Sequence, residues 1–69
     1  MAVFDGARRA GLTTREAEVL AVYVESDKMA IVAQKLRISE HTAKNLMSRV
    51  YLKLDVAHAA AAVAKVTTA

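Results

Sequence analysis

Residues 32–54, VAQKLRISEHTAKNLMSRVYLKL, are the stretch that decides the fold of this chain. Apolar residues recur at helical spacing on both sides of a short break in the middle of it. After the break, Ser39 is a good N-cap, and Glu40 lies where the positive end of a helix dipole favours an acidic side chain. The pattern therefore predicts one helix over about 28–36 and a second over about 40–54.

The break between these two helices is only a few residues long. Asp27 is the expected N-cap of the helix over 28–36, and Ile38 is expected to fill the core at the turn. Two helices joined by so short a turn follow the helix-turn-helix plan.

The helix over 40–54 has two different faces at about 100° per residue. One face is apolar and consists of Ala43, Leu46, Met47, Val50 and Leu54. The opposite face is polar, rich in hydrogen-bond donors and free of acids, and consists of His41, Lys44, Asn45, Ser48 and Arg49. A face that is merely solvated usually mixes both charges, so the polar face is the candidate functional surface.

Two further helices are expected outside this pair. Thr13 and Glu16 form a capping-box pattern that predicts a helix ending near Ser26. The alanine-rich stretch over 57–66 predicts a last helix with small side chains, which would let another helix pack closely against it. We expect residues 1–11 to be a flexible lead-in and residues 12–69 to form one all-α, four-helix domain. Its predicted core is Leu20, Val24, Val32, Leu36, Ile38, Leu46, Val50 and Leu54.

Composition and charge exclude several classes of protein. The chain of 69 residues has no cysteine and two histidines, so neither a metal site nor a nucleophile-base pair stands at a recognisable spacing. We expect no enzymatic activity, no metal and no cofactor. No apolar run has the length of a membrane span, and a cytoplasmic location, on the nucleoid when bound to DNA, is expected. Residues 28–54 carry six basic residues and one acidic residue, which suggests a nucleic-acid-binding face.

Five segments of the chain resemble one family at the correct spacing. Residues 12–20, LTTREAEVL, are similar to the Leu-Thr-x-Arg-Glu-x-Glu-Val-Leu that opens the LuxR-type (GerE/NarL-like) DNA-binding domain. Residues 32–39, VAQKLRIS, resemble its Ile-Ala-x-x-Leu-x-Ile-Ser. The shorter segments 42–44, 53–56 and 62–63 resemble its Thr-Val-Lys, Lys-Leu-Gly-Val and Ala-Val. Met1 and the short lead-in fit a stand-alone small regulator, or a domain excised from a larger protein.

The resemblance implies a transcription regulator whose helix over 40–54 enters the DNA major groove and whose last helix forms a homodimer. The expected base contacts are Lys44, Asn45, Ser48, Arg49 and His41. The expected phosphate contacts are Lys28, Lys35, Thr42 and Lys53. The expected dimer interface is Val56, Ala60, Ala61, Val63 and Ala64.

The sequence also departs from the family pattern. The glycine usual after the first helix is Ser26, and the basic residue expected early in the next helix is Ala30. Met29 and Ile31 would then be adjacent apolar residues on the surface, which is typical of a protein interface. A helix-turn-helix module that binds or antagonises a second regulator protein is therefore the alternative to a DNA-binding regulator.

Overall fold

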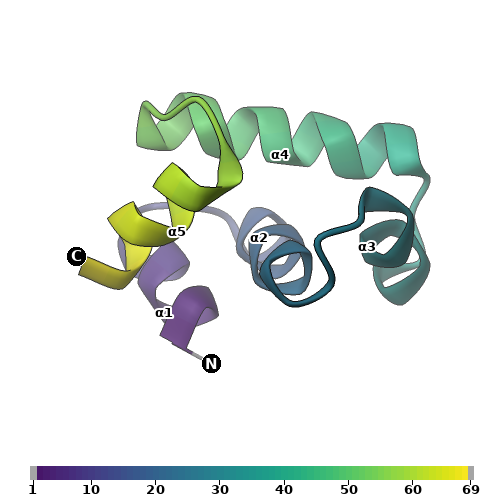
Figure 1. The fold of residues 1–69 in the computed structure, drawn as a ribbon, viewed down its shortest axis with the longest axis horizontal. Helices are drawn as coiled ribbons and strands as arrows, with labels where there is room; N and C mark the ends of the chain where they lie inside the picture. Colours follow the sequence, from purple (N-terminus) through teal and green to yellow (C-terminus); the bar gives the residue numbers. More distant parts are fainter. Residues whose placement is uncertain (1, 69) are drawn as a thin grey trace.

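The computed structural model describes residues 2–68, and within this range it contains helices and no strand. The helices are α1 (Ala2–Arg9), α2 (Thr14–Ser26), α3 (Met29–Leu36), α4 (Glu40–Leu54) and α5 (Ala59–Thr68). Figure 1 shows α4 along one side of the molecule, with α3 at one end, α1 and α5 at the other and α2 between them. The all-α prediction is confirmed.

The predicted capping box starts α2. The Glu16 backbone N–H donates to the Thr13 hydroxyl at 3.2 Å, and the Thr13 backbone N–H donates to the Glu16 carboxylate at 2.9 Å. Two N–H groups that a helix start leaves unpaired are thereby satisfied. This confirms the start of α2.

Three helices end on a residue in the left-handed conformation that is not glycine. Asp27, Arg37 and Asp55 have φ of 57°, 57° and 56°. Asp27 donates its backbone N–H to the Tyr23 carbonyl at 2.7 Å and so caps the C-terminus of α2. The prediction that Asp27 is the N-cap of the next helix is therefore wrong. Lys28 holds that position, without a side-chain cap.

The core lies where α2 meets α3, α4 and α5. Of the predicted core residues, Leu20, Val32, Val50 and Leu54 are buried, and Leu36, Ile38 and Leu46 are half-buried and packed against them. Val24 is the exception, because 40% of its surface is exposed. It lies in the last turn of α2, where α5 presents only small side chains over it. Val19 and Val66 are fully buried instead.

The N-terminal segment forms a helix, which corrects the prediction of a flexible lead-in for residues 2–9. α1 packs against α2 and α5, and its Ala7 is fully buried. Gly6 is also buried, and its backbone lies directly against the Val66 carbonyl of α5. Arg8 donates to the Leu12 carbonyl at 3.0 Å and ties the end of α1 to the start of α2. This packing gives α1 the tertiary contacts that a single short helix needs.

Replacing Gly6 with alanine is expected to destabilise the protein. A Cβ at Gly6 would overlap the Val66 carbonyl oxygen, so α1 and α5 would have to separate. Overpacking of about 1–3 kcal/mol would lower the Tm by on the order of 5–15 °C in a domain this small. Helix propensity alone would raise the stability, because alanine is about 1 kcal/mol more favourable than glycine inside a helix. A Tm in thermal unfolding that stays level or rises would show that α1 does not pack this closely.

Candidate nucleic-acid interface

The turn between α3 and α4 fixes how α4 lies on the domain. The Ile38 N–H donates to the Ala33 carbonyl at 3.0 Å, which closes the end of α3. The Thr42 N–H donates to the Ser39 side-chain oxygen at 3.0 Å, which confirms Ser39 as the N-cap of α4. Ile38 itself packs against the core as predicted. The two caps and this apolar contact set which face of α4 points outward.

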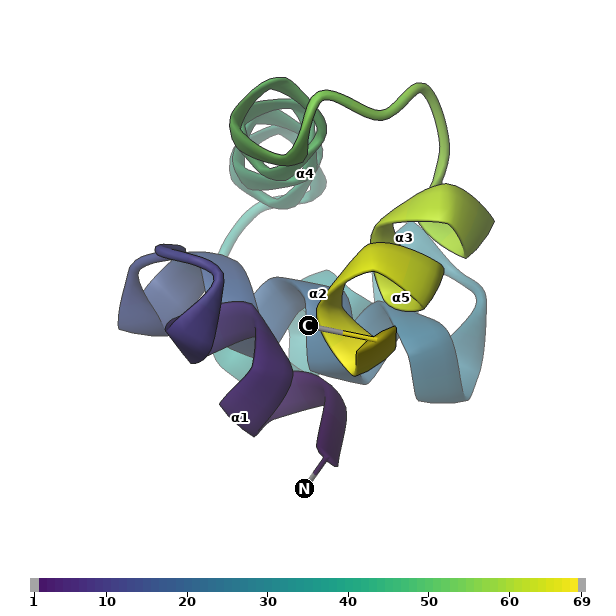
Figure 2. The same cartoon turned by 90° about the vertical axis from the view of Figure 1, so that its left-hand side faces the viewer.

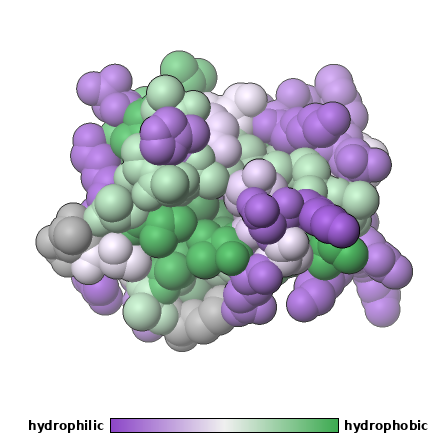
Figure 3. All heavy atoms as spheres, viewed as in Figure 1, coloured by the Kyte–Doolittle hydropathy of each residue, from purple (hydrophilic) through white to green (hydrophobic). Residues whose placement is uncertain are grey.

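α4 is buried along one face and exposed along the other. Ala43, Met47, Val50 and Leu54 are buried in the core. The five predicted base-contacting residues all lie on the exposed side: His41, Lys44, Asn45, Ser48 and Arg49. Figure 2, which looks along α4, shows that the outer side of the helix is not covered by another helix. In Figure 3, hydrophilic side chains gather over the half of α4 next to α3.

The predicted phosphate-contacting residues are all exposed and belong to α3, to its N-cap or to α4. Lys28 and Lys35 stand at the two ends of α3, and both are exposed. Thr42 is exposed in the first turn of α4, where its hydroxyl accepts from the Ser39 hydroxyl at 3.0 Å. Lys53 is exposed in the last turn of α4, but its ammonium group already has a partner. Lys53 therefore differs from Lys28 and Lys35, which have no ion pair within residues 2–68.

That partner is Glu16, which the sequence analysis assigned only to the capping box. The Lys53 Nζ lies 2.8 Å from Glu16 Oε1, which ties the end of α4 to the start of α2. Only 3% of the Glu16 side chain is exposed, against 43% of the Lys53 side chain. Burial raises the pKa of Glu16, but the hydrogen bond from Lys53 and the bonds from Thr13 outweigh it, and the pKa lies below its ordinary value.

Replacing Glu16 with glutamine is expected to remove an acid-sensitive part of the stability. The folded state lowers the pKa of Glu16, so this stabilisation is complete above the ordinary value of about 4.3 and is lost as the pH falls through the lowered value. Glutamine also fits a capping box, so the variant removes the charge and keeps the cap. Urea unfolding from pH 6 to pH 3 should show the two proteins converging in acid.

The matched control for this change is Glu18→Gln. Glu18 pairs with Arg15 at 3.8 Å on the surface, where an ion pair contributes little. This variant should follow the wild-type pH profile. If the profile of Glu16→Gln ran parallel to that of the wild type, the pair with Lys53 would not be charged in the folded protein.

The last helix is attached to α4 by contacts that the sequence analysis missed. The Lys65 ammonium donates to the Leu54 carbonyl at 2.6 Å, at the C-terminus of α4. His58 starts α5 by accepting the Ala61 N–H at its Nδ1, at 3.2 Å. Basic side chains often bind the free carbonyls at the C-terminus of a helix. The only sequence signal for the first contact is therefore that Lys65 is a basic residue on the helix that follows α4.

The predicted dimer residues do not all lie on one open surface. Ala60 and Ala64 of α5 are exposed, whereas Ala61, Val63 and Val56 are half-buried. Val66, near the end of α5, is fully buried in the core of its own chain. The open side of α5 is therefore a narrow surface around Ala60 and Ala64.

The surface patch predicted around Met29 and Ile31 is less open than the sequence suggests. Both residues are half-buried, and Met29 packs against the core.

No group of His, Cys, Asp or Glu within residues 2–68 is arranged to hold a metal ion. None of the helices described combines the length and apolar composition that a membrane span requires.

A helix-turn-helix formed by α3 and α4, with a polar outer face on α4, defines the class of helix-turn-helix DNA-binding domains. Residues 10–66 match the family model described as "Bacterial regulatory proteins, luxR family". The chain therefore belongs to the LuxR family of DNA-binding regulators, as its sequence motifs predicted. The match begins after α1, so this helix lies outside it. No curated protein and no solved structure shows a significant match to this chain.

Proposed function

We propose that this protein is a sequence-specific regulator that binds double-stranded DNA with α4 in the major groove. The observation that carries the proposal is the exposed face of α4, on which five donor-bearing side chains stand together; the one acid of α4 is Glu40, in its first turn. The major groove accepts an α-helix and presents a distinct pattern of acceptors and donors at each base pair. The buried face of α4 holds the helix to the domain and leaves this outer face free for DNA.

The side chains of α4 suit the reading of base edges. Asn45 can pair in two places with adenine, and Lys44 or Arg49 can donate to the two acceptors of guanine. Ser48 can contact several bases, and His41, about two turns earlier, stands near the start of the helix. We assign base contacts to these five residues. Together, these contacts would determine which DNA sequence the protein prefers.

Phosphate contacts would hold α4 in register on the duplex. Lys28 and Lys35 on α3 and Thr42 on α4 are exposed and suited to this role. Lys53 can take part while keeping its bond to Glu16, because an ammonium group has three donors and that bond uses one. Changing Lys35 should accordingly weaken binding to all sequences alike.

The experiment that tests the proposed function is selection of bound sites from random duplex DNA by the purified protein. A common motif should emerge, and binding to it should weaken steeply as salt rises, because the lysines displace counterions from phosphate. Recovery of unrelated sequences, or an affinity that does not change with salt, would contradict the proposal. The second outcome would point to an apolar contact with another protein.

We further propose that two copies pair through α5 when bound to DNA. The supporting features are the small exposed side chains of Ala60 and Ala64 and the half-buried Val63, Ala61 and Val56 beside them, which allow a close approach of two helices. A two-fold axis would place the two α4 helices on one side of the duplex. The selected sites should therefore contain half-sites about 10 bp apart.

Replacing Ala64 with glutamate is expected to abolish paired loading without unfolding the monomer. Ala64 is exposed, so the folded chain tolerates the larger side chain, whereas two glutamates across an axis would repel each other. Sedimentation on a two-half-site duplex should show one copy of the variant and two of the wild type. The control is Ala10→Glu, which adds the same charge at an exposed position outside α5. Two copies of Ala64→Glu with unchanged cooperativity would place the dimer contact elsewhere.

A further inference from the structure

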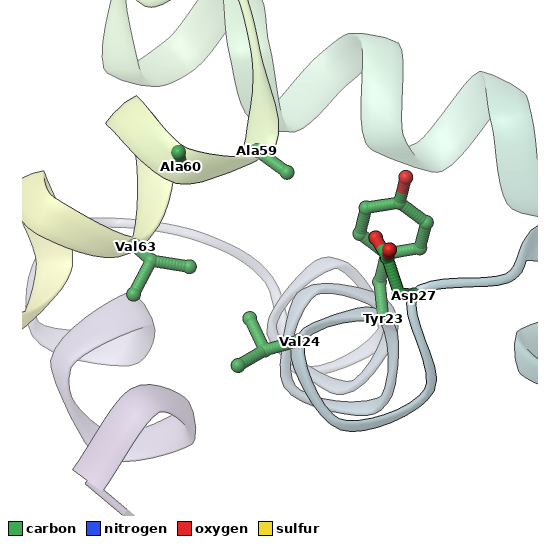
Figure 4. A pocket seen from close by; sticks show the side chains of 6 residues that line it. All are labelled: Tyr23, Val24, Asp27, Ala59, Ala60 and Val63. Carbon is green, nitrogen blue, oxygen red and sulfur yellow. The ribbon is translucent and has the colours of Figure 1, made fainter.

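A hollow of about 350 Å³ opens between the C-terminal turn of α2 and the first turns of α5. It is lined by Tyr23, Val24, Asp27, Ala59, Ala60 and Val63. Figure 4 shows Val24 and Val63 facing each other across it, with Tyr23 and Asp27 side by side at one end. The space-filling view shows apolar surface gathered in the same region, between α2 and α5 (Figure 3).

The walls of the hollow are apolar because of two features of the sequence. α5 begins with four alanines, so its first turn fills little space above α2. Val24 lies on the inner side of α2 but remains 40% exposed because nothing larger covers it. Volumes of roughly 300–1,000 Å³ with mainly apolar walls and a few polar groups are typical of small-molecule sites.

The polar end of the hollow carries a negative charge that no hydrogen bond or ion pair within residues 2–68 satisfies. The Asp27 carboxylate has no such partner, and the Asp27 backbone is held in place by its N–H bond to the Tyr23 carbonyl at 2.7 Å. Asp27 also stands at the C-terminus of α2, where the helix dipole adds negative potential. No basic side chain lines the hollow. A cation is therefore the group that this end would attract.

The aromatic ring of Tyr23 strengthens this preference. The ring stands next to Asp27, with its hydroxyl directed toward α4 (Figure 4). The ring face of Tyr23 can contact a cation held by Asp27.

We propose that this hollow is a binding site for a small molecule that joins an apolar body to one cationic group, such as a protonated amine. The apolar body would lie between Val24 and Val63, and the amine would donate to the Asp27 carboxylate beside the Tyr23 ring. The site lies on the α2–α5 side of the domain, whereas the proposed DNA-contacting side chains are on the outer face of α4.

The test is a titration followed by amide chemical shifts, with three probes of similar size: protonated phenethylamine, neutral 2-phenylethanol and anionic 3-phenylpropanoate. The titration uses a protein concentration at which sedimentation shows a monomer, because Ala60 and Val63 also belong to the proposed dimer surface. Phenethylamine should shift the amides of residues 23–27 and 59–63. It should bind roughly threefold to fivefold more tightly than the neutral probe, as one partly solvated ion pair allows. The anion should bind most weakly.

Two variants and a control make the result specific. Asp27→Asn keeps a residue that tolerates the left-handed conformation, and it should remove the preference for the amine over the alcohol. Ala60→Leu should fill the hollow and abolish binding of all three probes. Glu25→Gln removes an exposed acid that does not line the hollow and should leave the preference unchanged. Equal binding of the three probes, an unchanged preference in Asp27→Asn, or shifts at other residues would overturn the proposal.

Discussion

Replacing Lys44, Asn45 and Arg49 together with alanine is expected to abolish sequence-specific DNA binding while leaving the fold intact. All three side chains are exposed on α4, and none of them packs in the core. Each base-reading residue that is lost costs about 1–3 kcal/mol, so the loss of three would bring a selected site close to the affinity of random DNA. Titration of a selected duplex and of a scrambled duplex measures this difference directly.

The control for the triple variant must remove the same charge from elsewhere on the protein. Arg9→Ala combined with Arg15→Ala removes two positive charges from α1 and α2, as the triple variant removes two from α4. It should weaken binding to both duplexes and keep the preference for the selected one. If the triple variant still discriminated between the duplexes as the wild type does, α4 would not be the helix that reads DNA.

Replacing Leu20 with alanine is expected to remove most of the stability of the protein. Leu20 is fully buried at the centre of α2, and a Leu→Ala change in such a position costs about 2–5 kcal/mol. A core as small as this one contributes only about 3–5 kcal/mol in total, and the chain has no cysteine to form a disulfide. Urea unfolding at 25 °C should show a largely unfolded variant before denaturant is added.

Leu52 provides the matched control, because the same change is made to the same residue type. It is 81% exposed on α4, so its truncation should change the unfolding free energy by no more than about 0.5 kcal/mol. A Leu20→Ala protein as stable as the Leu52→Ala protein would show that the core is not built around α2.

The local elements of the fold could be predicted from sequence because short-range chemistry sets them. The Thr13–Glu16 capping box and the Ser39 N-cap each depend on residues three positions apart, and both are present as predicted. The two faces of α4 follow from helical periodicity, which gave the buried and exposed residues correctly apart from Leu46, which is half-buried. The family that the match over residues 10–66 shows was predicted from the resemblance of residues 12–20, 32–39 and three shorter segments to the LuxR-type pattern.

The C-terminal ends of the helices were harder to predict. An aspartate suits two roles at this position, the N-cap of a helix and a C-terminal cap with positive φ. The backbone conformation of Asp27 in the folded chain shows that it has the second role. No glycine marked the end of α2, so the pattern alone placed Asp27 at the start of the next helix.

The tertiary structure alone decided the contacts between residues far apart in the chain. Gly6 against Val66, Lys53 with Glu16 and Lys65 with the Leu54 carbonyl each join different helices. Periodicity shows that a side chain faces inward or outward, but it does not show which helix lies opposite. Val24 is on the inward side of α2 and stays exposed because the residues of α5 opposite it are small. The sequence by itself thus determined α2 to α5, the two faces of α4 and the family, whereas the formation and packing of α1 and the open hollow beside α5 depended on how the helices meet.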